Sequence, residues 1–413
     1  MEHSVEQLTT LLGLSRQIGT VQDLKTLLAH LDEAAREVLN CERTAVFLYD
    51  AEHDELYSSF ATGDQKIRFS SKKGLAGEAF QTGRTINIPD AYADPRFNPA
   101  IDRSTGFRTK SLLTVPMQGY EGEVVAVLQL VNKRGGDFTS EDESLALTFA
   151  SLAGVVVQRQ MLLDVYAVQQ KMELEMSVAH DIQLSLMPGE NPRIDGFDIA
   201  GWNKPAAETG GDVYDFIHLA DNRLGILVAD ASGHGLGPAL VAVQCRAMIR
   251  ALFTTTEELK TVITQANVIL NQDLTLGHFI TVFLGILDPK TAMIEYVSGG
   301  HAPILYYSHA SGEINTDAAT TQPLGFLDSI DGTPAEPIIM QRGDLLILIT
   351  DGFYEWENSN GEEYGIDRVI SVIRENQSRT ATEIVEAIYT EVLEFGAGTV
   401  QNDDLTVILV KKI

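Results

Sequence analysis

Cysteine is nearly absent from this chain of 413 residues, which has only Cys41 and Cys245, far apart and inside apolar segments. The sequence therefore offers neither a disulfide framework nor a cysteine-based metal motif. Basic residues are also scarce, because 30 Lys and Arg stand against 58 Asp and Glu, a formal net charge of -28. This charge disfavours nucleic acids and anionic membrane surfaces as partners.

Segments that would direct the chain to a membrane are also missing from the sequence. The N-terminus has no basic-then-apolar signal, and no apolar run approaches the ~18 residues of a spanning helix. Hydrophobic residues make up 44% of the chain, an ordinary globular composition, and the length suits two or three domains. We therefore expect a soluble, cytoplasmic protein.

The stretch Thr209–Gly235 predicts a β-hairpin with a carboxylate at each open end. Apolar runs flank a turn at Asp221 and Asn222, and Asp212 and Asp230 each lie nine residues from Asp221. In an antiparallel pair centred there, their Cβ atoms would be about 5 Å apart. Either residue alone would more often be an ordinary turn residue. Together, two such close charges need a cation between them to stay ionised in a partly buried site.

Three further acidic residues lie at strand ends near the C-terminus. Asp351 follows the apolar run 345–350, and Asp403 and Asp404 precede the apolar run 405–410. Antiparallel neighbours would bring these carboxylates to the same sheet edge as the hairpin pair. Ligation by oxygen alone suits Mg²⁺ or Mn²⁺ and disfavours zinc. Since two such ions can activate a water and hold a phosphoryl group, the pattern predicts phosphoester hydrolysis.

Six motifs, GGDVYDF, ADASGHG, GGHAP, PLG, TDGFYE and DDLTV, resemble in sequence and order those of PPM-type metal-dependent serine/threonine phosphatases. The resemblance covers about residues 188–413 and is strongest to the bacterial branch that dephosphorylates anti-anti-sigma factors. It implies two Mn²⁺ or Mg²⁺ ions and a small phosphorylated regulatory protein as substrate. It also implies that catalysis depends on the metal-ligating side chains of Asp212, Asp230, Asp351 and Asp403 and on the backbone carbonyl of Ala231. Asp404 matches a position that is not a ligand.

Histidines in and near these motifs could act in catalysis or metal binding, or could have no chemical role. His234 and His301 could act as a general acid, but a histidine beside glycines more often supports a turn, and two metals make a dedicated base unnecessary. His180 and Asp181 form a His-Asp pair like that of some metal-binding phosphohydrolases. No other histidine has matching spacing, so we expect this pair to face solvent on a helix.

The N-terminal part of the chain predicts a second domain. Residues 4–40 have helical periodicity, 44–49 and 55–61 predict a hairpin, and 111–116 and 124–131 predict strands. Between the hairpin and the strand at 111–116, residues 84–109 read as one long loop with three prolines. A helix is expected to start after Phe138, where Thr139 can cap it together with Asp142 or Glu143.

Residues 20–157 resemble a GAF domain, and GLAG, NIPDAYADPRFNP and STGFRT resemble the regulatory GAF domains of cyclic-nucleotide phosphodiesterases and cyanobacterial adenylyl cyclases. The resemblance implies a ligand such as cyclic AMP or cyclic GMP, contacted by Ala76, Thr105 and Thr109. Asn98 and Gln129 depart from the cyclic-GMP pattern, which leaves the ligand open. The family signature is complete, and its Lys-to-Asp bridge implies fold support by Asn132, Lys133, Phe138, Asp142 and Glu143.

Between the two domains, one helix has apolar residues at the 4,3 spacing of a coiled coil. Its seam has one polar member, Glu175, and the full seam comprises Val165, Val168, Met172, Glu175, Ala179, Ile182 and Leu186. A coiled coil would make the protein a homodimer. The alternative is a single helix packed on its own domain, because the run barely reaches three to four heptads.

These observations predict an α+β protein of four parts. They are an N-terminal helix at 1–19, a GAF sensor at 20–157 with an antiparallel sheet flanked by helices, a coiled-coil linker at 158–188, and an α-β-β-α sandwich phosphatase at 189–413. We expect a signalling phosphatase controlled by a small ligand. The alternatives are a catalytically inactive scaffold and a cyclic-nucleotide phosphodiesterase.

Overall fold

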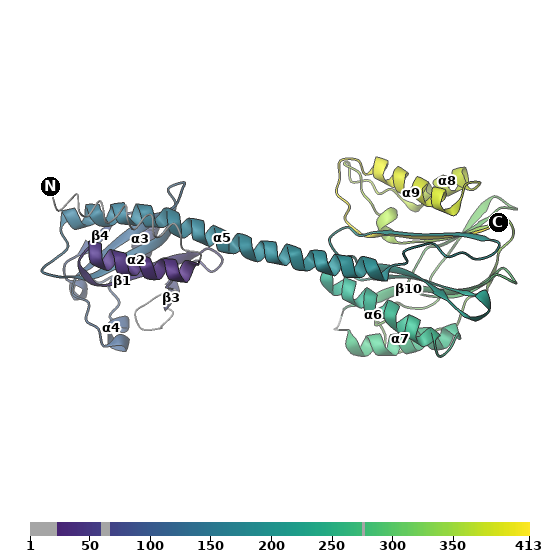
Figure 1. Ribbon diagram of the computed structural model, residues 1–413, viewed down its shortest axis with the longest axis horizontal. Helices are drawn as coiled ribbons and strands as arrows, with labels where there is room; N and C mark the ends of the chain where they lie inside the picture. The colour runs from purple at the N-terminus through teal and green to yellow at the C-terminus, as the bar shows by residue number, and fades with distance from the viewer. Residues whose placement is uncertain (1–22, 59–66, 275–276) are drawn as a thin grey trace. The chain divides into compact units, whose positions relative to one another are not determined.

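The computed structural model describes residues 23–58, 67–274 and 277–413, which fall into two compact units divided between Lys171 and Met172 (Figure 1). The helix predicted at 1–19 lies outside the described residues. Helix α5 (Ser140–Leu186) is continuous across the division. The predicted limit between residues 157 and 158 therefore falls inside one helix, and the four domain limits stay predictions.

The first unit is built on a six-stranded antiparallel sheet in the order β3-β2-β1-β6-β5-β4. The predicted hairpin is confirmed, because β1 pairs with β2 and Leu48 lies opposite Tyr57. Strand bounds are β1 Cys41–Asp50, β2 Glu55–Ser58, β3 Ile67–Ser70, β4 Ile86–Ile88, β5 Leu112–Gln118 and β6 Val124–Lys133. Alternate residues of β1 face opposite sides, so Val46 and Leu48 enter one core and Phe47 the other.

Helices cover both faces of this sheet. Helix α2 (Leu24–Val38) starts at Asp23, whose Oδ1 accepts a hydrogen bond from the Thr26 backbone N–H at 2.8 Å. Its apolar stripe, including Leu27 and Leu31, is buried in a core shared with the first turns of α5. Helix α3 (Gly74–Thr82) lines the other core through Ala76. This arrangement confirms an antiparallel sheet flanked by helices.

The GAF signature supports the fold as expected. Lys133 Nζ lies 2.5 Å from Asp142 Oδ1, at the start of α5. The Thr139 backbone N–H donates to Asp142 Oδ2 at 2.9 Å, and the Asp142 N–H donates to Thr139 Oγ1 at 3.3 Å. Asn87 Nδ2 donates to Glu143 Oε1 at 2.8 Å. These contacts join β4, β6 and α5.

The prediction of one long loop over residues 84–109 is wrong. The segment contains strand β4, the 3-10 helix η1 (Ala91–Ala93) and helix α4 (Ala100–Thr105). Asp90 caps η1 by accepting from the Tyr92 backbone N–H, and Gly106 ends α4 with a left-handed backbone, φ 68°. These elements are shorter than the window over which periodicity distinguishes helix from loop.

The second unit stacks two antiparallel sheets of five strands, ordered β14-β11-β10-β9-β8 and β13-β12-β15-β16-β7. The first comprises β8 Asp212–His218, β9 Leu224–Ala231, β10 Ile280–Asp288, β11 Met293–Gly299 and β14 Ile338–Ile339. The second comprises β7 Phe197–Lys204, β12 Ile304–Ser308, β13 Glu313–Asp317, β15 Leu345–Ile349 and β16 Leu405–Lys412. A turn of 3-10 helix, η2 (Ala220–Asn222), joins β8 to β9, and another, η3 (Asp351–Phe353), follows β15.

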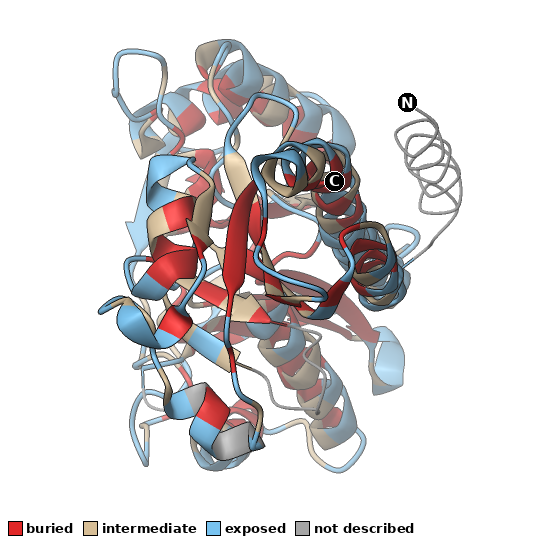
Figure 2. Cartoon of the chain, turned by 90° about the vertical axis from the view of Figure 1, so that its left-hand side faces the viewer, coloured by how far each residue is buried: buried red, intermediate tan, exposed pale blue. Residues whose placement is uncertain are grey.

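A pair of helices covers the outer face of each sheet. Helices α6 (Leu236–Phe253) and α7 (Leu259–Asp273) pack on the first sheet, and α8 (Ile366–Asn376) and α9 (Ala381–Phe395) pack on the second. Alternation along β16 shows the layers, because Val407 faces α8 and α9 while Ile408 enters the core between the sheets. Buried residues are marked red in Figure 2. The predicted α-β-β-α sandwich is confirmed.

Helices α5 and α6 are long and apolar enough to cross a membrane by length and composition. This differs from the expectation that no segment approaches that limit. Core helices of soluble proteins meet the same criterion, and one side of α6 is buried against the first sheet through Ala242, Cys245 and Ile249. The criterion therefore does not decide the location of the protein, and cytoplasmic localisation stays a prediction.

Candidate active site

The hairpin β8–β9 places two carboxylates opposite each other, as its turn centre predicts. Asp212 is the first residue of β8 and pairs in register with Asp230 near the end of β9. The strands approach closely at this end, where the Ala231 backbone N–H donates to Gly211 O at 3.1 Å. A Cβ atom on Gly211 would lie 2.8 Å from Ala231 O, so glycine is needed there.

The second sheet contributes the remaining acidic residues at the same edge. Asp351 follows β15 directly, and Asp403 and Asp404 precede β16, the strand that pairs with β15. Thr350 joins the two sheets, because its Oγ1 donates to Asp212 Oδ2 at 2.8 Å and accepts from the Thr406 backbone N–H at 2.9 Å. The sequence did not single out Thr350, although it lies within TDGFYE.

Asp404 has a different role from its neighbour Asp403. It is buried, and its carboxylate accepts from the Ala206 backbone N–H at 2.7 Å and from the Asp212 backbone N–H at 3.2 Å. Asp403 is exposed and caps its own turn, since its Oδ1 accepts from the Asp404 N–H at 2.8 Å. Asp404 therefore fixes the main chain that carries Asp212.

Burial and mutual repulsion raise the pKa values of these carboxyl groups. Burial, followed by the charges of Asp230 and Asp404, raises the pKa of Asp212 well above its usual range. Burial, followed by the charges of Asp351 and Asp403, raises the pKa of Asp230 to about 7. Burial and the charge of Asp403 also raise the pKa of Asp351. Among described residues, no cationic side chain is a leading influence on any of them.

The donor chemistry of this cluster fits divalent cations. Closely spaced carboxylates in a partly buried site are costly unless positive charge compensates them, and ligands that are all oxygen select Mg²⁺ or Mn²⁺. In the described part of the chain, no three acidic, cysteine or histidine side chains are already arranged as a metal cage. The side chains that would hold such ions are those of Asp212, Asp230, Asp351 and Asp403, the acidic residues at this sheet edge. Their assignment and that of the Ala231 carbonyl as ligands stay predictions.

The histidines of the motifs occupy contrasting positions. His234 is exposed in the turn between β9 and α6. His301 is buried, its Nε2 has no hydrogen-bond partner among the described atoms, and burial lowers the pKa of its imidazole to about 4. A buried imidazole with a lowered pKa is neutral near pH 7 and has no imidazolium proton to donate, which argues against the general-acid interpretation of His301.

The first unit contains a separate cavity of about 580 Å³ at the residues predicted to contact a nucleotide. Ala76 and Thr109 line it, as do Asn98 and Gln129. Thr105 is the last residue of α4, but its side chain lies outside the described residues. The cavity volume is within the usual range of about 300–1,000 Å³ for small-molecule sites.

Polar groups fix one wall of this cavity. Asp102 is buried, and its two carboxylate oxygens accept from the Thr109 backbone N–H at 2.7 Å and from Thr109 Oγ1 at 2.8 Å. On another side, the Arg43 guanidinium lies 3.8 Å from the centre of the Phe107 ring. Arg96 bridges Glu78 on α3, at 2.8 Å, and Asp94, at 2.6 Å. The cavity therefore combines aromatic, cationic and hydrogen-bonding groups.

Comparison with known protein families matches both units. Residues 220–412 match the model of the Stage II sporulation protein E (SpoIIE) family, and residues 23–157 match the GAF domain model. The solved SiaA-PP2C domain of Pseudomonas aeruginosa is 23% identical, covers 60% of this chain and 99% of its own, and has a TM-score of 0.51. That likeness shows a PP2C-type fold for the second unit.

Two further relatives match smaller shares of this chain. The RsbU and RsbW domains of a Mycobacterium tuberculosis protein are 25% identical over 54% of this chain and 61% of that chain, with a TM-score of 0.45. A probable 3',5'-cyclic phosphodiesterase, pde-5 of Caenorhabditis elegans, is 32% identical over 169 residues. That match covers 37% of this chain, which spans only 23% of the length of the relative.

Proposed function

Because the chain joins an N-terminal GAF domain to a C-terminal domain of the PPM/SpoIIE family of protein serine/threonine phosphatases, we propose that it is a ligand-regulated protein phosphatase. Its substrate would be phosphoserine or phosphothreonine on a small regulatory protein similar to an anti-anti-sigma factor. The observation that carries this proposal is the convergence of carboxylates from both sheets around the register pair Asp212 and Asp230.

Four side chains would hold two Mn²⁺ or Mg²⁺ ions, those of Asp212, Asp230, Asp351 and Asp403, with the carbonyl of Ala231. Such ions supply a water of lowered pKa and charge that stabilises a transferring phosphoryl group. The residues of the chain itself position Asp212. Thr350 Oγ1 orients Asp212 by donating to it at 2.8 Å, and Asp404 holds the Asp212 backbone N–H at 3.2 Å.

The GAF cavity supports a cyclic nucleotide as the regulatory ligand. Helix α3 begins at the cavity with no side chain capping its first amides, and Gly74, Leu75 and Ala76 line the space. Such amides attract a phosphate. Phe97 and Phe107 offer apolar surface to a base, and the Thr109–Asp102 pair offers hydrogen-bonding atoms. The named similarity to a cyclic phosphodiesterase agrees with this ligand class.

A homodimer formed through α5 is the remaining part of the proposal. Seam residues with apolar side chains are exposed in the single chain, as in Val165 at 66%, Val168 at 69%, Met172 at 60% and Ile182 at 57%. Large apolar side chains in solvent at the 4,3 spacing support a coiled coil between two copies. In a single chain, these seam residues would leave an apolar stripe of α5 in contact with water.

A single assay on the full chain tests phosphatase against phosphodiesterase activity. We expect Mn²⁺-dependent hydrolysis of p-nitrophenyl phosphate, a changed rate when cyclic AMP or cyclic GMP is added, and no consumption of either nucleotide. Consumption of cyclic nucleotide without monoester hydrolysis would replace the proposal by the phosphodiesterase alternative. Absence of both activities with Mn²⁺ and with Mg²⁺ would favour the inactive scaffold. Calorimetry of the same chain with each nucleotide tests the ligand separately.

A further inference from the structure

The end of α5 carries a buried glutamine between exposed neighbours. The Gln183 side chain is 6% exposed, whereas Ile182 is 57% exposed and Leu184 is 46% exposed. A primary amide is costly to bury unless its donor and acceptor groups find partners. Gln183 must therefore contact polar groups of the second unit, to which this end of the helix belongs.

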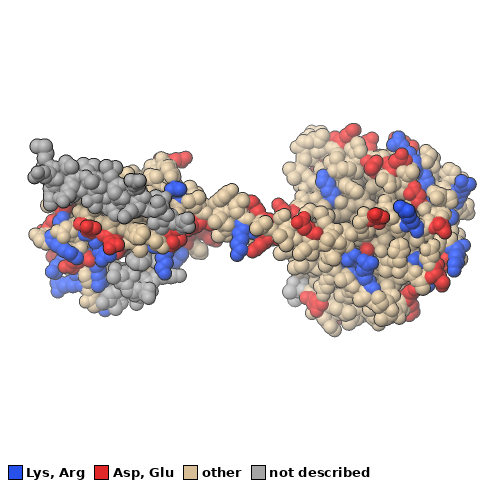
Figure 3. Space-filling view, viewed as in Figure 1, with Lys and Arg blue, Asp and Glu red and all other residues tan. Residues whose placement is uncertain are grey.

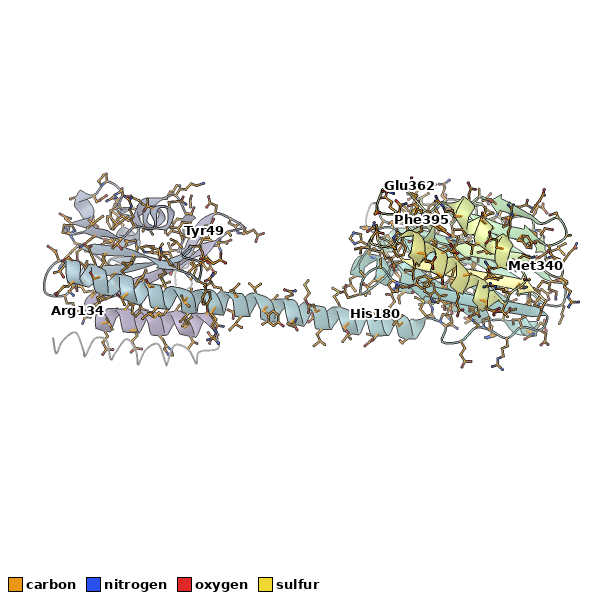
Figure 4. All side chains as sticks on the ribbon, turned by 90° about the horizontal axis from the view of Figure 1, so that it is seen from above. Tyr49, Arg134, His180, Met340, Glu362 and Phe395 are labelled. Atoms are coloured by element: carbon orange, nitrogen blue, oxygen red, sulfur yellow. The ribbon has the colours of Figure 1, made fainter. Side chains whose placement is uncertain are left out.

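Both ends of this amide bind one residue of the loop that leads to the active site. Gln183 Nε2 donates to Gly210 O at 2.6 Å, and the Gly210 backbone N–H donates to Gln183 Oε1 at 3.1 Å. One turn earlier, His180 Nδ1 lies 2.5 Å from Glu208 O. Figure 4 shows His180 near the C-terminal end of α5. The expectation that the pair faces solvent holds for Asp181, which is exposed, whereas the half-buried ring of His180 also contacts the loop main chain.

The same loop is held from a second direction by Asp404. Its carboxylate accepts from the backbone N–H groups of Ala206 and Asp212 at 2.7 and 3.2 Å. A Cβ atom on Gly210 would collide with that carboxylate, so the loop fits closely against it. Residues 206–212 are thus fixed between α5 and Asp404, and the last of them is a predicted metal ligand.

We propose that Gln183 is a positioning residue that sets Asp212 for metal binding by holding Gly210. This inference rests on the proposed function, because it takes Asp212 as a ligand. Gln183 would act through its two hydrogen bonds with the Gly210 backbone. Since hydrogen bonds are lost beyond about 3.5 Å, a displacement of α5 by about 1 Å releases Gly210. Helix α5 begins in the GAF domain, and Gln183 and His180 are points at which that helix contacts the metal-site loop.

The test compares Gln183→Leu with Gln170→Leu in the full chain. Gln170 is an exposed glutamine on the same helix, which makes the second variant a matched control. Loss of a residue that supports a metal ligand lowers metal affinity by about 10- to 100-fold. For Gln183→Leu we expect that loss in Mn²⁺ affinity by calorimetry, and the same shift in the Mn²⁺ concentration that gives half-maximal phosphomonoester hydrolysis. At saturating Mn²⁺, the turnover number should return to within about threefold of the parent value.

Gln183→Glu keeps an acceptor for the Gly210 N–H but loses the donor to Gly210 O. The Mn²⁺ affinity of this variant should therefore lie between those of the parent and of Gln183→Leu. If Gln183→Leu does not fold, the affinity of Gln183→Glu decides. Mn²⁺ affinity in a folded Gln183 variant equal to that of Gln170→Leu would overturn the proposal. Because calorimetry measures binding without turnover, a parent that binds Mn²⁺ but hydrolyses nothing would refute the proposed function and still test the positioning role.

Discussion

Replacing Asp230 by Asn should stabilise the metal-free protein while abolishing its metal response. Asp230 lies opposite Asp212, and burial and the charges of Asp351 and Asp403 raise its pKa to about 7. An amide has nearly the same size and carries no charge, so it removes the repulsion without leaving a cavity. Where function requires like charges to converge, a metal ligand is expected to destabilise the protein as long as the metal is absent.

The sign of the pH dependence follows from proton binding. A carboxyl group with a folded pKa of about 7 and an ordinary value of 3.8 holds its proton in the folded state over that range and loses it on unfolding. The free energy of unfolding of the metal-free parent should therefore fall as pH rises from about 4 to 7. The full rise in pKa corresponds to about 4 kcal/mol, and we expect Asp230→Asn to recover about 2 to 4 kcal/mol at pH 8.

Urea unfolding with EDTA at pH 5 and pH 8 measures this effect in the full chain. The chain has two tryptophans, Trp202 and Trp356, and both lie in the second unit, so their fluorescence follows that unit. The matched control is Asp221→Asn in the same hairpin, where the exposed turn residue has a φ of 58° that Asn also adopts. Equal stability of parent and Asp230→Asn at pH 8 would refute the electrostatic reasoning, and retained Mn²⁺-dependent turnover would refute the ligand assignment.

Two other predictions use the same chain. His301 is buried and neutral with a pKa of about 4, so as pH falls below 6.5 the imidazole takes up a proton in the unfolded state before it does so in the folded state. The free energy of unfolding of the parent should therefore fall by about 3 kcal/mol between pH 6.5 and 4, relative to that of His301→Gln. Urea titration checks this, and a constant difference between the two proteins would contradict it. Glu175→Leu should tighten the dimer and weaken the ligand response, as measured by ultracentrifugation and by phosphatase rate with and without cyclic nucleotide. Unchanged dimer affinity together with an unchanged response would exclude the α5 seam as the switch.

The strand pairing at the site was predictable because local signals agree there. Turn residues at Asp221 and Asn222 fix the centre of the hairpin, and apolar runs of similar length on both sides fix its register. The positions of Asp351 and Asp403 at strand ends were equally visible. With the pairing of β15 and β16, these local features place the carboxylates at one edge.

The contacts that support the site could not be read from the sequence. Asp403 and Asp404 are chemically identical neighbours, and only the fold shows that one is exposed while the other binds the backbone at Ala206 and Asp212. Gln183 is a polar residue on a helix with no local feature to indicate burial. Its partner Gly210 is distant in the chain, and such pairings depend on tertiary packing that local propensity does not describe.

Gln183 borders the predicted seam on α5, and this bears on how a ligand could act. Successive helical residues are turned by about 100°, so Gln183 points well away from Ile182 but within about 20° of Met172, eleven residues earlier. The dimer seam and the contact with Gly210 therefore use adjoining sides of the helix. A ligand changes the active site only if it favours one of two states. Rotation of α5 within a dimer would give those states, because it changes the seam and the Gln183–Gly210 contact together. If so, Glu175→Leu should lose its effect on the ligand response in a chain that already carries Gln183→Leu, whereas two independent routes would give additive effects.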